Sequence, residues 1–409
     1  PAEHRRGVRE RQALLPQGFS TGQPSTLRET RMALSGELKQ WIDMVITRNA
    51  SDLILTEHQP PIIRVVGDLV PLDGPKLTAE DIGRYAYQVL SKEQQRTFEH
   101  TLEVDASFGI PDIARFRVNV FQQQGAPGVV IRMLPSRIPT LDELGVPEIV
   151  KRWLMVPHGI LITTGPTGSG KSTSQAGMIG CLNEGKRYHV ITIEDPIEYV
   201  HRHGTCTIEQ REVGRDTRSF GDALKHVFRQ APDVIMIGEM RDRETFETAL
   251  QLAETGHLVL ATLHTGDAMQ SISRIIDVFP PDQHQQVRVQ LSLTLIGILV
   301  QQLVPTLDGT GRLLAVEVLE ANAAVRNLIR KNDLQQLYSV IQTSTNEGMT
   351  TMNASLLALF KQGKISLEQA MLFTTRQQEL EQLVSREARV PSAAHASLYQ
   401  ERKRQLSAV

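Results

Sequence analysis

Cysteine, net charge and long apolar runs are all scarce in this chain of 409 residues. The two cysteines, Cys181 and Cys206, exclude a disulfide framework and a four-thiolate metal site, and a reducing compartment is the default expectation. A net charge of −2 gives no global field that would attract nucleic acid or anionic lipid. The longest apolar stretch, Leu291 to Val304, is interrupted by two glutamines and is too short to span a bilayer. With no visible signal peptide, we expect no direct membrane insertion and no nucleic-acid partner.

Composition and periodicity divide the chain into six segments. In order, we expect a disordered arginine-rich tail (1–34), a small α+β domain (35–140), a linker (141–150), an α/β core (151–280), a helical part of the same domain (281–376) and a polar tail (377–409). The core alternates apolar runs with helix-compatible stretches, which is typical of a mostly parallel sheet. Its expected strands are 160–164, 189–193, 234–237 and 258–263. Beyond position 280 the periodicity predicts helices, the first of them over Gln283 to Gln302.

The most informative stretch of the chain is the run from Gly165 to Ser172. It fits the phosphate-binding pattern G-x-x-x-x-G-K-[ST] without a mismatch, and it follows an apolar strand and precedes a helix-compatible stretch. Glycines let backbone N–H groups point at phosphate oxygens, and the helix N-terminus adds partial positive charge. Lys171 would contact the β- and γ-phosphates, and Ser172 would hold Mg²⁺. The expected nucleotide-binding residues are Gly165, Pro166, Thr167, Gly168, Ser169, Gly170, Lys171, Ser172 and Thr173.

Polar side chains also follow three further strands of the expected sheet. Because ligands bind at the carboxyl ends of strands in open α/β sheets, we expect these side chains to surround the terminal phosphate. Glu239 suits a residue that organises Mg²⁺ and its waters. A second carboxylate must orient the attacking water, and we favour Glu198 over Glu194 for that role. His264 is a candidate for sensing the γ-phosphate, although a lone histidine at a strand end is as often structural, and His257 is a weaker candidate.

Two arginines of the first domain are candidates for the positive charge that phosphoryl transfer requires. Arg117 and Arg132 lie on adjacent predicted strands joined by one turn, so they can face the same side as a paired guanidinium clamp. The alternative interpretation is that two arginines on a solvated strand face only improve solubility.

Together these features resemble the secretion and type IV pilus ATPase superfamily over residues 38–375. The resemblance rests on the glycine loop, on the acidic box Ile193–Glu198, on the strand that leads to Glu239 and on the box Thr255–Thr265. Within that family the chain is similar to the retraction ATPases, because it lacks the four-cysteine zinc insert and the longer N-terminal domain typical of extension and secretion relatives. It also carries a block that resembles the AIRNLIR motif of retraction ATPases, namely Ala324, Val325, Arg326, Asn327, Leu328, Ile329 and Arg330.

The resemblance implies an α/β fold with a RecA-like P-loop ATPase core, an N-terminal PAS-like α+β domain and a C-terminal helical region. It implies ATP and Mg²⁺ as ligands and a homohexameric ring. By the same resemblance the catalytic residues would be Glu198, Glu239, His257 and His264, with Arg117 and Arg132 as arginine fingers, and the Ala324–Arg330 block would serve retraction.

The expected function is therefore ATP hydrolysis that powers type IV pilus retraction and twitching motility. The motor would be cytoplasmic and peripheral at the inner membrane, with a pilus platform protein as partner and a paralogous retraction ATPase as a further candidate. Three alternatives remain open from sequence: an extension or type II secretion ATPase, an accessory ring subunit that depends on another motor, and a DNA translocase, which the near-neutral charge disfavours.

Overall fold

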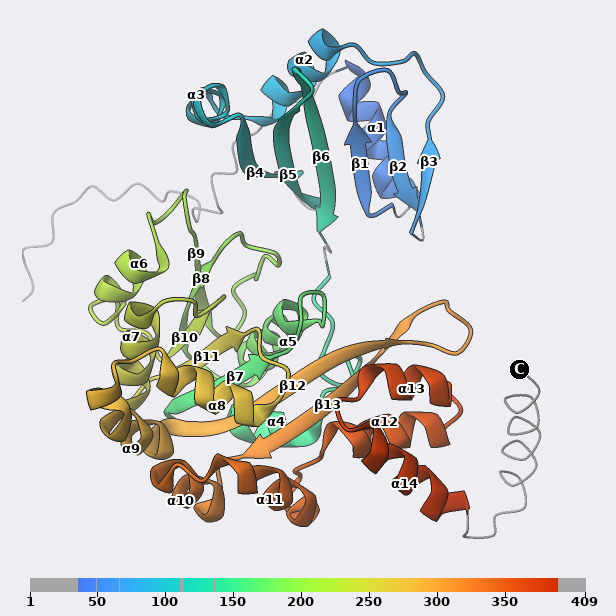
Figure 1. Ribbon diagram of the computed structural model, residues 1–409. Helices are drawn as coiled ribbons and strands as arrows, with labels where there is room; N and C mark the ends of the chain where they lie inside the picture. Colours follow the sequence, from blue (N-terminus) through green and yellow to red (C-terminus); the bar gives the residue numbers. More distant parts are fainter. Residues whose placement is uncertain (1–35, 49, 66, 111–113, 135–136, 389–409) are drawn as a thin grey trace, which may run out of the picture. The chain divides into compact units, whose positions relative to one another are not determined.

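The computed structural model describes residues 36–48, 50–65, 67–110, 114–134 and 137–388. This part of the chain forms two compact units, the first ending at Leu134 and the second comprising the residues after it (Figure 1). The expected tail over 1–34 and the end of the expected tail over 377–409 lie outside the described residues.

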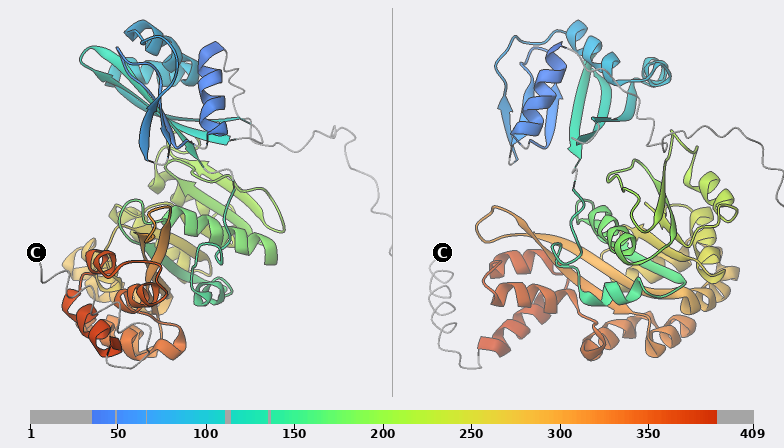
Figure 2. Two further views of the ribbon diagram at one scale, coloured as in Figure 1. Left: turned by 90° about the vertical axis from the view of Figure 1, so that its right-hand side faces the viewer. Right: turned by 180° about the vertical axis from the view of Figure 1, so that it is seen from behind.

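The first unit is an antiparallel sheet with helices packed on one face (Figure 2). Its elements are α1 (Gly36–Thr47), β1 (Asp52–Leu55), β2 (Ile62–Val65), β3 (Asp68–Pro71), α2 (Ala79–Val89), α3 (Lys92–Thr101), β4 (Glu103–Ile110), β5 (Ala114–Gln123) and β6 (Ala126–Leu134), with strand order β3-β2-β1-β6-β5-β4. Strand β5 shows why the sheet has two different faces. Phe116, Val118 and Val120 are fully buried in the core with the helices, whereas the residues between them are partly exposed.

The second unit is built on a seven-stranded sheet. Its strands are β7 (Gly159–Thr164), β8 (His189–Glu194), β9 (Thr207–Glu212), β10 (Val234–Ile237), β11 (Leu258–Leu263), β12 (Leu295–Pro305) and β13 (Arg312–Glu320), in the order β13-β12-β7-β11-β10-β8-β9. All neighbours pair in parallel except β13, which is antiparallel to β12. The four strands expected from the apolar runs are therefore confirmed, and they carry their loops to one edge of the sheet.

Helices cover both faces of this sheet (Figure 1). They are α4 (Glu148–Trp153), α5 (Lys171–Gly185), α6 (Phe220–Val227), α7 (Arg243–Glu254), α8 (Ala268–Asp277), α9 (His284–Thr294), α10 (Ala323–Lys331), α11 (Leu337–Thr343), α12 (Met352–Lys361), α13 (Leu367–Phe373) and α14 (Gln377–Ala388), with short 3₁₀ turns at Pro281–Gln283, Leu334–Gln336 and Thr345–Glu347. Helices α4 and α5 share one core with the sheet, and α6 to α11 share the core of the opposite face. Because both faces are buried, the central strands are apolar throughout.

The predicted helix over Gln283 to Gln302 is wrong in its second half. Helix α9 ends at Thr294, and Leu295 begins β12, which pairs with β7 on one side and β13 on the other. A strand buried on both faces has no alternation of polar and apolar residues, so its periodicity resembles that of a buried helix. The expected helical part of the chain therefore also supplies two strands of the central sheet.

The structure differs from the expected segment boundaries at two further places. Leu141, Val146 and Ile149 lie within the expected linker, yet they are buried in the core of the second unit with α5. The start of the expected polar tail forms α14, whose Leu380 and Val384 are buried against α12 and its neighbours. Both segments looked polar because only a few apolar side chains anchor them.

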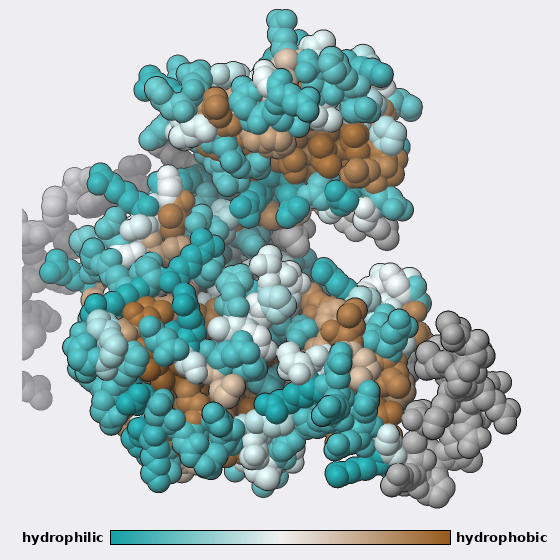
Figure 3. Space-filling model, in the orientation of Figure 1, coloured by the Kyte–Doolittle hydropathy of each residue, from teal (hydrophilic) through white to brown (hydrophobic). Residues whose placement is uncertain are grey.

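The visible face of the molecule is mostly polar (Figure 3). Among the described residues, the large apolar side chains with the greatest exposure are Leu372, Leu293 and Leu307, which belong to α13, α9 and the turn between β12 and β13. Among the helices of the described residues, none combines the length and apolar character that a membrane crossing requires.

Candidate nucleotide-binding site

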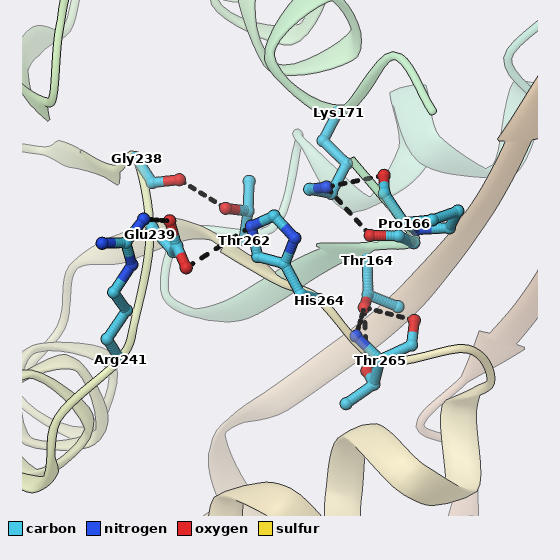
Figure 4. A network of polar contacts seen from close by, with 10 residues as sticks. Thr164, Pro166, Lys171, Gly238, Glu239, Arg241, Thr262, His264 and Thr265 are labelled. Carbon is cyan, nitrogen blue, oxygen red and sulfur yellow. Dashed lines mark hydrogen bonds and ion pairs between the residues drawn. The ribbon is translucent and has the colours of Figure 1, made fainter. Parts of the chain in front are cut away.

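The glycine loop leads from the end of β7 into the start of α5. At Gly165 the backbone φ is +145°, and a Cβ atom there would lie 2.3 Å from the carbonyl oxygen of Gln301 and 2.7 Å from Ser169 Oγ, so only glycine fits. Lys171 is the first residue of α5, and its Nζ donates to the carbonyl oxygens of Gly165 at 2.9 Å and Pro166 at 3.0 Å (Figure 4). The lysine thus closes the loop around the space in which the pattern places phosphate oxygens.

Lys171 senses two carboxylates from other strand ends. Its side chain is buried, and burial lowers the pKa of the ammonium group, whereas the charges of Glu239 and Glu198 act in the opposite direction. Coulombic influence from both carboxylates requires that all three groups lie close to one another. The sheet therefore brings together the three side chains on which the expected chemistry depends.

Glu239 lies between two positively charged or chargeable side chains beyond the end of β10. Its carboxylate accepts from Arg241 Nη2 at 2.7 Å and lies 3.4 Å from His264 Nε2 (Figure 4). The Arg241 hydrogen bond is the largest cause that lowers the pKa of Glu239, and the charges of His264 and Lys171 add to it. Glu239 is consequently held as a carboxylate, the form that can organise a divalent cation and its waters.

Glu194 and Glu198 differ in their surroundings. Glu194 is buried, and it accepts hydrogen bonds from Thr192 Oγ1 at 2.6 Å, from Gln210 Nε2 at 3.0 Å and from the backbone N–H of Glu198. Burial raises the pKa of Glu194 to about 7 in spite of these donors. Glu198 is only partly buried. Of the two, Glu198 is the carboxylate that keeps access to a bound ligand, which supports its choice as the residue that orients water.

The ends of β7 and β11 are joined directly beside the loop. Thr164 Oγ1 contacts the carbonyl oxygen of Thr265 at 2.9 Å and accepts from its N–H at 3.0 Å (Figure 4). Thr265 Oγ1 in turn lies 2.6 Å from Ser271 Oγ on α8. Because His264 precedes Thr265, the position of this histidine is tied to both the loop and α8.

Comparisons with known proteins agree with this site. A family model described as type II/IV secretion system protein matches residues 33–311. PilT of Pseudomonas aeruginosa, named a type IV pilus retraction ATPase, is 46% identical over 323 residues, which cover 79% of this chain and 94% of that protein. PilU of the same organism, named a type IV pilus ATPase, is 44% identical over 335 residues, which cover 82% and 88%. A crystal structure of the pilus retraction motor PilT with bound ADP has a TM-score of 0.80 at 48% identity, covering 85% of this chain and 100% of that chain.

The chain belongs to the type II/IV secretion system protein family. It is a PilT-like secretion ATPase, as the sequence resemblance predicted, and its fold class is confirmed as α/β with a helical C-terminal region. In this PilT-like ATPase the loop, Glu239, Glu198 and His264 converge on the carboxyl edge of the sheet, at the crevice where α/β proteins bind ligands.

His257 is not brought to the loop of this PilT-like ATPase. It precedes β11, whereas His264 follows that strand, so the two residues lie at opposite edges of the sheet, about 20 Å apart at the usual rise of a strand. His257 Nδ1 lies 3.1 Å from the carbonyl oxygen of Leu252 near the end of α7, and the ring packs edge-on against Phe228. These contacts describe a structural histidine, contrary to the catalytic role expected from the resemblance.

Arg117 and Arg132 occupy opposite positions on β5 and β6 of the first unit, as the sequence predicted. The two residues are direct cross-strand partners. Arg132 Nε donates to Asp52 Oδ1 at 2.8 Å, while Arg117 has Asp105 at 3.8 Å. Their guanidinium groups therefore form a pair on the open face of the sheet, and their role as arginine fingers stays a prediction.

The Ala324–Arg330 block forms most of α10 and is largely structural in this chain. Val325, Leu328 and Ile329 are buried in the core beneath the sheet. Arg326 donates to the carbonyl oxygens of Ser292 at 2.5 Å, Leu293 at 2.9 Å and Leu295 at 2.9 Å, which are the last residues of α9 and the first of β12. The guanidinium therefore caps the C-terminus of α9.

Two functional candidates carried no role in the sequence analysis. Arg241 was visible at the end of β10, but only the structure shows that it contacts Glu239. Gln301 lay inside a predicted helix, whereas in β12 it is fully buried and donates to Ser174 Oγ at 2.6 Å, on the second turn of α5. A glutamine pair interrupting an apolar run was the available signal for Gln301.

Proposed function

We propose that this chain is a hexameric motor ATPase that hydrolyses ATP with Mg²⁺ to power type IV pilus retraction. The observation that carries the proposal is the meeting of Lys171, Glu198 and Glu239 at one edge of the sheet, where the charges of both carboxylates act on the lysine. Phosphoryl transfer depends mainly on positioning and on stabilising charge, and these three side chains supply both.

Each residue of the site has a distinct task in this proposal. Lys171 neutralises β- and γ-phosphate charge at the start of α5, and Glu198 orients the attacking water and accepts its proton. Ser172 would hold Mg²⁺, with Glu239 reaching its waters, and the metal would supply neutralisation of the charge on the phosphate oxygens. His264 contacts Glu239 and would register the γ-phosphate.

The residues present fit a phosphate group. Ser169 Oγ is buried within the loop and has no hydrogen-bond partner among the residues that the structure describes. Lys171 spends its hydrogen bonds on two carbonyl oxygens of the loop, which a phosphate oxygen would replace as a better acceptor for an ammonium group. Both features indicate a cradle in want of an anion.

Arg117 and Arg132 would act as arginine fingers on the nucleotide of a neighbouring subunit, which requires a ring. Hydrolysis and release would change the shape of that ring in rigid-body steps. Through an inner-membrane platform protein these steps would return pilin subunits to the bilayer, so the motor would work in the cytoplasm, peripheral to the membrane. The similarity to PilT, a named retraction ATPase, supports this direction of work.

A second candidate function is that of an accessory ring subunit that needs another motor. The specific observation in its favour is the similarity to PilU, which is nearly as great as the similarity to PilT. Against it stands the complete set of Lys171, Glu198 and Glu239 at the site.

The discriminating experiment is deletion of the gene followed by complementation with wild type or with Glu198→Gln. The retraction proposal predicts piliated cells that do not twitch, rescued by wild type and not by the variant. Loss of surface pili would indicate an extension or secretion ATPase. Rescue by Glu198→Gln together with full twitching would indicate that the chain assists another motor.

A further inference from the structure

The segment that carries Glu198 has no helix or strand of its own. It runs from the end of β8 to the residues before β9, and residues 195–200 are turns and irregular structure. A catalytic carboxylate on such a segment must be fixed by contacts from more rigid elements, because small displacements are costly in rate. The contacts that fix it come from β8 and from β9, the strand at the sheet edge that the sequence analysis did not predict.

Gln210 on β9 holds the segment at two backbone positions. Its Oε1 accepts from the N–H of His201 at 2.8 Å, and its Nε2 donates to the carbonyl oxygen of Tyr199 at 2.8 Å. The same Nε2 also donates to Glu194 Oε1 at 3.0 Å. Only an amide provides a donor and an acceptor at this place, so Asp, Glu or an apolar side chain would leave a partner unpaired.

Glu194 connects this amide to the backbone of Glu198 itself. The carboxylate accepts the N–H of Glu198 and also the hydroxyl of Thr192 on the same strand. The adjacent N–H, that of Ile197, donates to Glu212 Oε2 at 3.2 Å. Successive backbone groups around Glu198 are therefore anchored to side chains of β8 and β9, and none of these anchors is a side chain of the glycine loop.

We infer that Gln210, together with Glu194, is the positioning pair that aims Glu198 at the attacking water. The inference rests on the proposed catalytic role of Glu198. Neither Gln210 nor Glu194 touches the nucleotide in this account, so the pair sets the rate of turnover and not the affinity for ATP. Tyr199 is also anchored through its hydroxyl, 3.0 Å from Thr173 Oγ1, so loss of the amide loosens the segment without detaching it.

The test compares Gln210→Ala and Gln210→Glu with the double variant Glu194→Gln/Gln210→Glu in the full-length protein. Gln210→Glu sets a second carboxylate against Glu194 and the Tyr199 carbonyl oxygen. The double variant restores an amide–carboxylate contact with the partners exchanged, and the amide oxygen introduced by Glu194→Gln can still accept the N–H of Glu198. Glu209→Gln is the matched control, because its side chain lies on the same strand but is exposed and paired only with His189.

We expect kcat to fall about 10- to 100-fold in both single Gln210 variants, as for a misplaced catalytic group. Affinity for a fluorescent ATP analogue and the unfolding midpoint should stay close to wild type, and the double variant should recover part of kcat relative to Gln210→Glu. A kcat within about twofold of wild type for Gln210→Ala, or an equal loss of ATP affinity and kcat, would overturn the positioning role. Glu198→Gln serves as the reference, since full turnover in that variant would instead overturn the proposed function of Glu198.

Discussion

Buried charge at single residues makes the stability of this protein depend on pH. Burial raises the pKa of Glu194 to about 7, well above the value of a glutamate in an unfolded chain. Between about pH 4.5 and 7 the folded protein therefore holds a proton that the unfolded chain has released, and the free energy of unfolding falls as pH rises through this window, by roughly 3 kcal/mol at most. Glu194→Gln should remove this slope in urea titrations at successive pH values. An unchanged slope in the variant would show that Glu194 does not titrate there.

Arg241 should influence the pH dependence of turnover through Glu239. Its hydrogen bond is the largest cause of the lowered pKa of Glu239, so Arg241→Gln should raise that pKa. The acid limb of the kcat profile should then move to higher pH, because Glu239 must be ionised to organise the metal waters. Arg243→Gln is the control, since that exposed side chain bonds to Gln283 instead. Coincident acid limbs in wild type and Arg241→Gln would contradict this link.

Much of the candidate site could be predicted because its residues follow strands in recognisable patterns. Lys171, Glu198, Glu239 and His264 were all expected near one edge of a parallel sheet, and the structure brings them there. The role assigned to His257 failed because proximity in sequence to His264 says nothing about which edge of a strand a residue occupies. The contacts of Arg241 and Gln210 could not be predicted, since they depend on side-chain directions in loops.

At the scale of elements, the sequence predicted strands that stand alone between turn signals and missed those that continue from a helix. Strands β10 and β11 are bounded on both sides and were placed correctly. Strand β12 follows α9 without a turn, and its polar residue Gln301 finds its partner Ser174 more than a hundred residues earlier in the chain. Such a pairing is a property of the folded sheet and has no local signal.

The cap that Arg326 places on α9 gives the Ala324–Arg330 block a structural role that can be measured. Arg326→Ala leaves three carbonyl oxygens at the junction of α9 and β12 without this donor, and should lower the free energy of unfolding by about 2 to 3 kcal/mol. Arg330→Ala, which loses one long contact to Ser292 Oγ, should cost much less. Chemical denaturation of both variants checks this. Wild-type stability in Arg326→Ala would assign the residue to a partner contact instead.

At the scale of the whole molecule, the proposed motor draws its catalytic groups from two separate units. Arg117 and Arg132 belong to the first unit, and Lys171 belongs to the second. If the arginines act on the nucleotide of a neighbouring subunit, each subunit can lack one set and still be complemented. Mixing the inactive Lys171→Ala protein with inactive Arg117→Ala/Arg132→Ala protein, under conditions of subunit exchange, should restore part of the ATPase activity. A mixture as inactive as its components would argue that the arginines do not act across subunits.

The most direct test of the central claim is the ATPase turnover of Glu198→Gln measured beside its ATP affinity. The account predicts ATP binding close to wild type and turnover reduced by at least about a hundredfold, because the substitution removes only the group that orients and deprotonates water. Wild-type turnover in this variant would contradict the claim that Lys171, Glu198 and Glu239 act on one nucleotide.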